Sequence, residues 1–507
     1  MILRIKQLWN EKPLLLILLA GCFFRILAVI FSKGYGMHDD HFLVIEPAQS
    51  WVDGADYNSW LPFSHEPAMH PSGHSFFYTG LHFILFWLLK QIGVTDPQHK
   101  MYLVRFLHAV LSISIIYFGY KITEKIADQK RAKVVGILLA LFWFMPFLSV
   151  RNLVEFVCIP PLMYATWLLL IASEKKFSFR TYLWIGFIVG IAFSIRFQSI
   201  LFCGGFGLAL LFQKKWKEAI TLGIGFALCA AAIQGVVDSF VWHAPFVEFR
   251  EYVRYNLAHS TSYNTQPWYN YFPLLTGILI PPISLALLFG FVKKWKTQLI
   301  LFLPSFIFFA FHCYFPNKQE RFIIPIIPFI IILGWVGWSE FQEKSAFWQK
   351  RPKLTRVCWI FFWSVNLLPL LVVSVSYSKR NRVEAMTYIA AKHDVRSIVI
   401  EDSDNDKFTM LPLFYLQKWG HVFFVTKKFP LDSLYKQTTE LKNSPILPNY
   451  VVFMQKENID ARVATMKKYY PDLTYETTIQ PSFIDWLLNY MNPVNNNQTT
   501  YIYHLEK

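Results

Sequence analysis

The sequence predicts an α-helical multi-pass membrane protein that carries a small α/β domain at its C-terminal end. Hydrophobic residues make up 54% of the 507-residue chain and charged residues only 16%, a composition too apolar for a chain surrounded by water. The apolar residues form long runs separated by short basic loops, as in membrane-spanning helices. Residues 378–507 are more polar and alternate strand-like with helix-like patterns.

About eleven apolar runs are long enough to cross a bilayer, which takes roughly 17 to 25 residues. They lie at 13–31, 103–121, 134–150, 156–172, 182–197, 199–213, 219–236, 272–292, 298–314, 322–338 and 357–376. The basic N-terminal segment and the basic loops are expected to face the cytoplasm. Those loops are 121–133, 174–180, 213–217, 293–296 and 343–356.

This alternation of basic loops predicts two large loops on the outer side of the membrane, 32–102 and 237–271. The run 74–92 is also apolar, but if it crossed, every later basic loop would change side. We therefore predict a juxtamembrane or re-entrant helix there, and interfacial helices in the second loop. A transmembrane domain then covers residues 1–377, and an extracytoplasmic α/β domain covers 378–507.

The α/β domain is expected to alternate helices and strands. Strands are predicted at 397–400, 421–426 and 450–453, and helices near 383–392, 431–441 and 459–469. No motif in this domain demands catalysis, which favours a role as a lid or an acceptor platform.

The stretch GMHDDHFLVIEPAQS (36–50) gathers titratable groups where the first span meets water. Asp39 and Asp40 are adjacent, His38 and His41 flank them, and Glu46 follows one to two turns later if the segment is helical. Such a cluster suits acid-base chemistry, although one of the aspartates alone would also cap a surface helix. Four consecutive residues rarely point at one ion, so no metal site is predicted.

Further charged residues fall at the outer ends of spans, where they are costly and often mark a site. They are Glu155, Arg196, Lys318 and Arg321. Cations that face carboxylates suit a phosphate-bearing donor and an acid-base step in one cavity. Taken singly, Glu155 could be favoured by the helix dipole and Arg196 could snorkel to the headgroups.

Together these segments resemble the glycosyltransferase family 22 group of the GT-C superfamily, which are polyprenyl-phosphate-mannose-dependent mannosyltransferases. MHDDHFLVIEPA (37–48) is similar to the family's HPDEhFQ-x-x-EPA, with Asp39 at its Asp and Asp40 at its Glu. The other matching segments are VRNLVEF (150–156), DSF (238–240), YN (255–256), PWYNYF (267–272) and NKQERFIIP (317–325).

The resemblance implies a GT-C fold and an inverting, metal-free transfer without a cofactor. A mannose-type sugar would move from a polyprenyl-phosphate donor to a hydroxyl of a lipid-linked glycan or glycolipid acceptor on the outer face. We expect catalytic roles for Asp39 as general base, Asp40 and Glu155, and contacts to the donor phosphate from Arg196, Lys318 and Arg321. Expected substrate contacts are His38, His41, Glu46, Glu66, Asp238, Trp268 and Tyr269.

Two alternatives stay open: the same fold with an aminoarabinose- or glucose-type donor, and a lipid or sugar transporter or flippase. The net charge of +16 does not predict nucleic-acid binding, because the basic residues sit in short loops between apolar runs. The single Asn497-Gln498-Thr499 sequon and the cysteine-free tail favour a bacterial inner membrane, with the endoplasmic reticulum membrane as the alternative.

Overall fold

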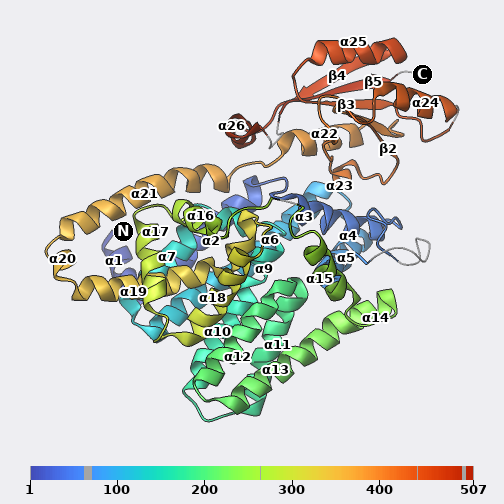
Figure 1. Ribbon diagram of the computed structural model, residues 1–507. Helices are drawn as coiled ribbons and strands as arrows, with labels where there is room; N and C mark the ends of the chain where they lie inside the picture. The colour runs from blue at the N-terminus through green and yellow to red at the C-terminus, as the bar shows by residue number, and fades with distance from the viewer. Residues whose placement is uncertain (1, 62–70, 263, 442–443, 494–497, 506–507) are drawn as a thin grey trace. The chain divides into compact units, whose positions relative to one another are not determined.

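The protein is described here by a computed structural model that covers all residues except 1, 62–70, 263, 442–443, 494–497 and 506–507 (Figure 1). Glu66 and Asn497, singled out in the sequence, lie outside the described residues. The chain forms two compact units. The membrane unit comprises Met1–Val29, Ser59–Leu81 and Leu103–Val375, and the C-terminal unit comprises Ile30–Asn58, His82–Tyr102 and Ser376–Lys507.

The membrane unit is helical, and within the described residues six helical segments are long and apolar enough to cross a membrane. These are Pro13–Phe31 (α2), Pro97–Ile126 (α6), Val154–Ser173 (α9 and α10), Trp216–Trp242 (α13, a π-helical turn and α14), Glu320–Lys344 (η5 and α19) and Pro352–Ser374 (α21). Four shorter apolar helices are Phe179–Ile195 (α11), Phe197–Phe212 (η2 and α12), Ile283–Lys293 (α17) and Leu299–Tyr314 (α18). This confirms the predicted class of multi-pass helical membrane protein.

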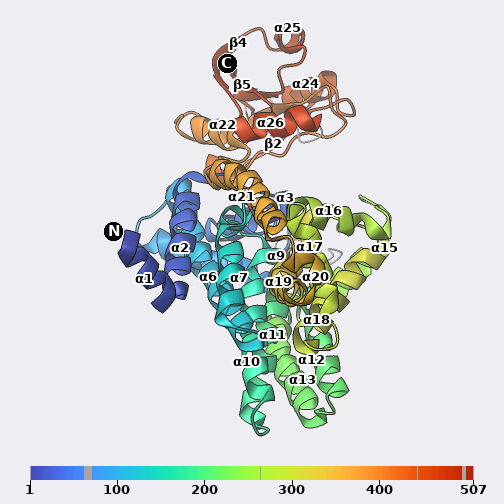
Figure 2. The same cartoon turned by 90° about the vertical axis from the view of Figure 1, so that its left-hand side faces the viewer.

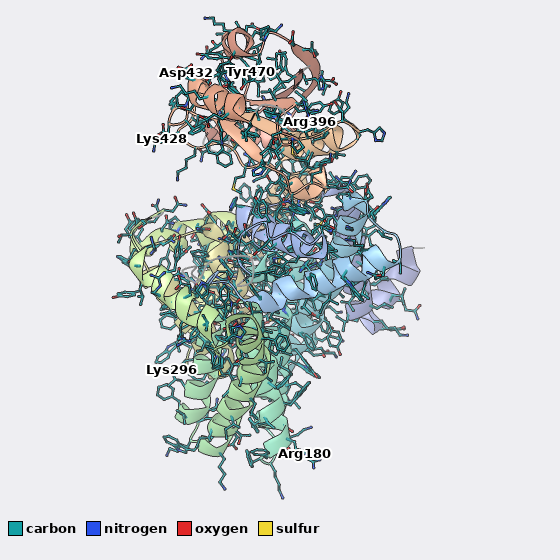
Figure 3. The ribbon with its side chains drawn as sticks, turned by 90° about the vertical axis from the view of Figure 1, so that its right-hand side faces the viewer. Arg180, Lys296, Arg396, Lys428, Asp432 and Tyr470 are labelled. Atoms are coloured by element: carbon teal, nitrogen blue, oxygen red, sulfur yellow. The ribbon has the colours of Figure 1, made fainter. Side chains whose placement is uncertain are left out.

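The remaining helices before the C-terminal sheet are shorter or less apolar. They are α1 (Ile2–Glu11), α3 (His38–Phe42), α4 (Ile45–Val52), α5 (Phe76–Gln91), α7 (Gln129–Leu141), α8 (Met145–Leu148), α15 (Val247–Ala258), η4 (Trp268–Asn270), α16 (Tyr271–Ile278) and α20 (Ala346–Gln349). Figure 2 shows α10, α11, α12 and α13 running side by side, as they also do in Figure 1. Arg180 and Lys296, which belong to two of the predicted cytoplasmic loops, lie at the surface (Figure 3).

Two predicted spans are interrupted. The run 134–150 is helical only to Leu141, and the short helix α8 follows it. The run 272–292 is divided between α16 and α17 by residues 279–282, which include Pro281 and Pro282. A proline lacks the N–H that a helix needs and its ring clashes with the preceding turn, so an apolar run that contains a proline pair need not be one helix.

Glycines allow α17 and α19 to pack backbone against backbone. A Cβ added to Gly290 would lie 1.9 Å from the carbonyl oxygen of Gly334, and one added to Gly337 would lie 2.2 Å from that of Gly290. A Cβ on Gly334 would lie 2.4 Å from the carbonyl oxygen of Leu287. Small residues at such crossings are typical of membrane helices. In lipid the hydrophobic effect does not drive helices together, so they associate through the close van der Waals packing that small residues permit.

Gly334→Ala is therefore expected to destabilise the protein by about 1–3 kcal/mol, because the added methyl must separate the two backbones. Thermal unfolding of the purified protein in one detergent measures the effect. Gly207→Ala on α12 is the matched control, since a Cβ there meets nothing within 4 Å. Equal unfolding temperatures for both variants would contradict the packing argument.

The C-terminal unit contains a five-stranded sheet in the order β2-β1-β3-β5-β4. Its strands are β1 (Ile398–Glu401), β2 (Val422–Val425), β3 (Tyr450–Met454), β4 (Leu473–Ile479) and β5 (Thr500–Leu505). β1 pairs in parallel with β2 and β3, whereas β5 is antiparallel to β3 and β4. The residues of β1 and β3 are all buried, as the inner strands of a covered sheet are.

The helices of this unit are α22 (Arg380–Ala390), α23 (Leu413–Leu416), α24 (Leu431–Glu440), α25 (Ile459–Tyr469) and α26 (Phe483–Met491). The three predicted strands and three predicted helices are confirmed within a few residues, whereas α23, β4, α26 and β5 were not predicted. The segment after the first span belongs to the same unit, because Gly34 pairs with Ser378 and the Ser378 N–H donates to the Lys33 carbonyl at 3.1 Å.

Candidate active site

The Asp-His stretch forms two short helices rather than the single helix that its sequence permits. The first, α3, begins at His38, and a break at residues 43–44 separates it from α4. The Asp40 carboxylate accepts the Met37 N–H at 2.9 Å and is 5% exposed, so Asp40 caps its own helix. Asp39, in the first turn of α3, is partly exposed. The structure thus separates the two adjacent aspartates by environment.

His41 and Glu46 form a buried pair in the C-terminal unit. His41 Nε2 lies 2.9 Å from Glu46 Oε1, and the His41 ring stacks on Tyr35 with centroids 4.7 Å apart. Both carboxylate oxygens of Glu46 accept the Phe414 N–H, at 3.1 and 3.0 Å. His41 is 1% exposed and Glu46 is 0% exposed. These contacts hold α3 and α4 against α23, while His38 remains exposed and stacks on Phe42 at 4.6 Å.

The membrane unit brings Glu155, Arg196 and Arg321 together. Glu155 Oε1 lies 3.7 Å from an Nη atom of Arg196 and 3.6 Å from an Nη atom of Arg321. Glu155 begins a helical segment at α9, Arg196 follows the end of α11, and Arg321 lies in η5. All three are buried, so three separate elements deliver two guanidinium groups and one carboxylate to one place.

In each arginine of this cluster, the Nε atom donates a hydrogen bond to a nearby glutamine. Arg196 Nε donates to Gln198 Oε1 at 3.1 Å, and Arg321 Nε donates to Gln319 Oε1 at 2.8 Å. The guanidinium carbon of Arg196 lies 5.8 Å from the centroid of the Phe322 ring. Within the described part of the chain, neither Nη atom of Arg196 has a hydrogen-bond partner. The cluster therefore carries one more positive than negative charge and retains unused donors, which suits an anion.

Lys318 is buried near this region but is not an ion-pair partner of Glu155 within the described residues. Its ammonium donates to the Phe315 carbonyl and lies 5.9 Å from the centroid of the Tyr271 ring. Burial lowers the pKa of Lys318.

Asp238 belongs to a second buried cluster with Glu248, a residue outside the sequence motifs described above. Gln234 Nε2 donates to Asp238 Oδ1 and to Glu248 Oε2, both at 2.7 Å. The Glu248 N–H donates to Asp238 Oδ2 at 3.0 Å, and the Phe76 N–H donates to Glu248 Oε2 at 3.0 Å. The cluster joins the two predicted outer loops. Burial, and next the charge of Asp238, raise the pKa of Glu248 well above its usual value.

Stability is expected to fall as pH rises, because the folded protein holds the Glu248 proton more tightly than the unfolded chain does. The loss begins near pH 4.5, the ordinary pKa, continues through the raised pKa, and reaches at most about 1.4 kcal/mol per pH unit. Glu248→Gln should flatten this dependence, as thermal unfolding in detergent at several pH values will show.

The matched control is Glu251→Gln on the same helix, which breaks an ion pair with the exposed Arg254. A slope that Glu248→Gln leaves unchanged would show that this carboxyl is not the titrating group.

Trp268 and Tyr269 lie in η4 and are 65% and 53% exposed. Their rings meet edge to face with centroids 5.9 Å apart. They are open to a ligand, unlike Asp238, which is 0% exposed. The substrate contacts predicted for all these residues remain predictions.

The fold of the chain is similar to that of solved structures. ArnT from Cupriavidus metallidurans bound to undecaprenyl phosphate gives a TM-score of 0.62 over 96% of this chain and 97% of that chain, at 12% identity. The apo oligosaccharyltransferase of Archaeoglobus fulgidus gives 0.51 over 94% and 74%, at 11% identity. These likenesses establish the fold, which is the GT-C fold.

The family follows from the sequence as a whole. The profile of the Alg9-like mannosyltransferase family matches residues 16–429, and the chain belongs to this family, as its motifs indicated.

Relatives include a probable Dol-P-Man:Man(7)GlcNAc(2)-PP-Dol alpha-1,6-mannosyltransferase of Schizosaccharomyces pombe, 25% identical over 46% of this chain and 45% of the relative. The alpha-1,2-mannosyltransferase ALG9 of Mus musculus is 26% identical over 34% and 33%. GPI mannosyltransferase 3 of Yarrowia lipolytica is 21% identical over 74% and 70%. The chain thus spans less than half the length of the first two relatives.

Proposed function

We propose that this protein is an inverting glycosyltransferase that moves a mannose-type sugar from a polyprenyl-phosphate donor to a hydroxyl of a lipid-linked glycan or glycolipid. The observation that carries the proposal is the buried pair of arginines around Glu155, with its excess positive charge and its unused donors. A phosphate is the anion that two guanidinium groups bind well. Family membership and the names of the relatives support mannose as the sugar.

The reaction assigns a role to each group. The acceptor hydroxyl attacks the anomeric carbon of the sugar and gives its proton to the Asp39 carboxylate. The bond between that carbon and the phosphate oxygen breaks, and the polyprenyl phosphate leaves with the bonding electrons. Arg196 and Arg321 stabilise the negative charge that develops on it, and Glu155 positions both arginines. Asp40 positions Asp39 by capping the helix on which both lie.

The proposal includes further expectations about the site and its surroundings. Lys318 adds positive charge for the phosphate, and the exposed Trp268 and Tyr269 offer surfaces on which a sugar or lipid can stack. His38, His41, Glu46, Glu66 and Asp238 remain proposed substrate-contacting or site-supporting residues. The reaction takes place on the outer face of the membrane and needs no metal or other cofactor. A bacterial inner membrane is the proposed location.

Transfer of labelled mannose tests the function directly. Membranes that contain the protein receive polyprenyl-phosphate mannose with and without EDTA, and the lipid and protein fractions are counted separately. Label in a lipid product that requires the protein and persists in EDTA supports the proposal. Label that appears only when another sugar donor is supplied contradicts the assignment of mannose. If no donor gives a labelled product, the assignment of transferase activity is contradicted.

A further inference from the structure

The helix α26, near the end of the C-terminal unit, has an exposed apolar face. Phe483, Trp486, Tyr490 and Met491 are 66%, 52%, 77% and 72% exposed. Their spacing places them on one side of the helix. The Phe483 and Trp486 ring centroids are 6.1 Å apart, and those of Trp486 and Tyr490 are 5.9 Å apart, so the rings form a continuous row.

The polar side of α26 faces inward. Asp485 is the one charged residue of this helix, and it is 2% exposed. Its Oδ2 atom accepts the Arg380 N–H at 3.0 Å, while the Ser482 hydroxyl caps the helix by accepting the Asp485 N–H at 3.2 Å. This is the reverse of a helix on a water-facing surface, where polar residues point outward. The contact with Arg380 fixes α26 with its aromatic row turned outward.

Arg380, which contacts α26, follows a membrane span closely in the sequence. The last span, α21, ends at Ser374, and Arg380 begins α22 six residues later. Six residues reach at most about 20 Å even when fully extended. Arg380, whose N–H Asp485 of α26 accepts, is therefore joined to the end of α21 by a segment that spans at most about 20 Å. Figure 1 shows α26 beside the sheet of its unit rather than beneath it, and Figure 2 shows it in front of that sheet.

Tryptophan and tyrosine concentrate at the lipid–water interface, and short amphipathic helices with aromatic and aliphatic faces lie in its plane. With nine residues, α26 is too short to cross a bilayer. We infer that α26 lies in the headgroup region of the bilayer, where its aromatic face contacts lipid and attaches the C-terminal unit to the membrane surface. The exposed Arg380 side chain adds attraction to anionic headgroups.

Fluorescence quenching by lipid tests this inference in the full-length protein. A cysteine introduced as Met491→Cys, in a chain whose native cysteines are replaced, carries an environment-sensitive fluorophore. The protein is reconstituted into vesicles of phosphatidylcholine and phosphatidylglycerol with bromine atoms at a shallow or a deep acyl position. Lys436→Cys on α24, an exposed position of the same unit, is the matched control. Unchanged thermal unfolding shows that each variant is folded.

We expect severalfold stronger quenching at residue 491 than at residue 436, and stronger quenching by shallow than by deep bromines. The substitutions Phe483→Ser, Trp486→Ser and Tyr490→Ser together should abolish the difference, since they remove the aromatic row but keep the Asp485 contact. Equal quenching at both positions would overturn the inference. So would weak quenching at 491 combined with chemical cross-linking of that residue to a second copy of the chain, which would show that another protein covers the face.

Discussion

Asp39→Asn is expected to lower the rate of sugar transfer by about 10² to 10⁴ while leaving the protein folded. Asparagine has nearly the shape of aspartate but cannot take a proton from an acceptor hydroxyl. Asp39 is partly exposed in the first turn of α3, whereas Asp40 is buried and occupied as a cap. Initial rates with labelled polyprenyl-phosphate mannose in proteoliposomes measure the effect.

Asp96→Asn is the matched control for this substitution. Asp96 caps α6 by accepting the His99 N–H at 2.8 Å, and an asparagine can make the same bond. Its transfer rate should equal that of the unmodified protein. Near-normal transfer by Asp39→Asn, with donor at saturation, would remove Asp39 as the base.

Arg321→Ala is expected to weaken use of the donor by roughly 10- to 150-fold, which corresponds to the loss of one charge-assisted hydrogen bond of about 1.5–3 kcal/mol. The Arg321→Lys variant should use the donor less well than the unmodified protein but better than Arg321→Ala, because lysine keeps the charge but not the planar pair of donors. Polyprenyl phosphate alone should bind less tightly to Arg321→Ala, so equilibrium binding gives a readout that does not depend on transfer. Arg254→Ala, at an exposed arginine paired with Glu251, is the control.

Two substitutions in the cluster of Glu155, Arg196 and Arg321 should differ in their effect on the free energy of unfolding. Arg321→Ala leaves Glu155 with Arg196, a neutral pair, and should unfold near the normal temperature. Glu155→Gln leaves two buried cations without a carboxylate and is expected to cost about 3–5 kcal/mol. If Arg321→Ala proved the less stable of the two, the argument from the charge balance of the cluster would be wrong. If Arg321→Ala bound polyprenyl phosphate normally, the phosphate role of Arg321 would be wrong.

The positions of the membrane spans were predictable, because the length and apolarity of a run determine them. The breaks within two of these runs were not predictable in the same way. Pro281 and Pro282 were visible in the sequence, yet the apolar run continued through them and masked the break between α16 and α17. In the C-terminal unit, the buried strands β1 and β3 stood out as short apolar runs. β4 reads LTYETTI, with polar residues on both faces, and was missed because its pattern resembles a loop.

The candidate residues were predictable by type and position, but their partners were not. The motifs pointed to Glu155 and Arg321, and the charge at the outer end of a span pointed to Arg196; the structure shows that these three meet in the membrane unit. No local pattern could show that Glu248 pairs with Asp238, since the bonds depend on how two loops fold. One signal was present: Glu248 is the single charged residue of the apolar stretch 244–249.

The bond between Glu46 and the Phe414 N–H joins residues 368 positions apart. A ribosome adds about 5 to 20 residues per second, so roughly 20 to 70 s separate the synthesis of the two. Throughout that interval the nascent chain inserts its later helices while the segment next to Asp39 lacks its final support. A polypeptide released before residue 414 would occupy the bilayer yet never complete this contact. The buried contact that supports the segment next to Asp39 therefore forms only in chains translated beyond residue 414.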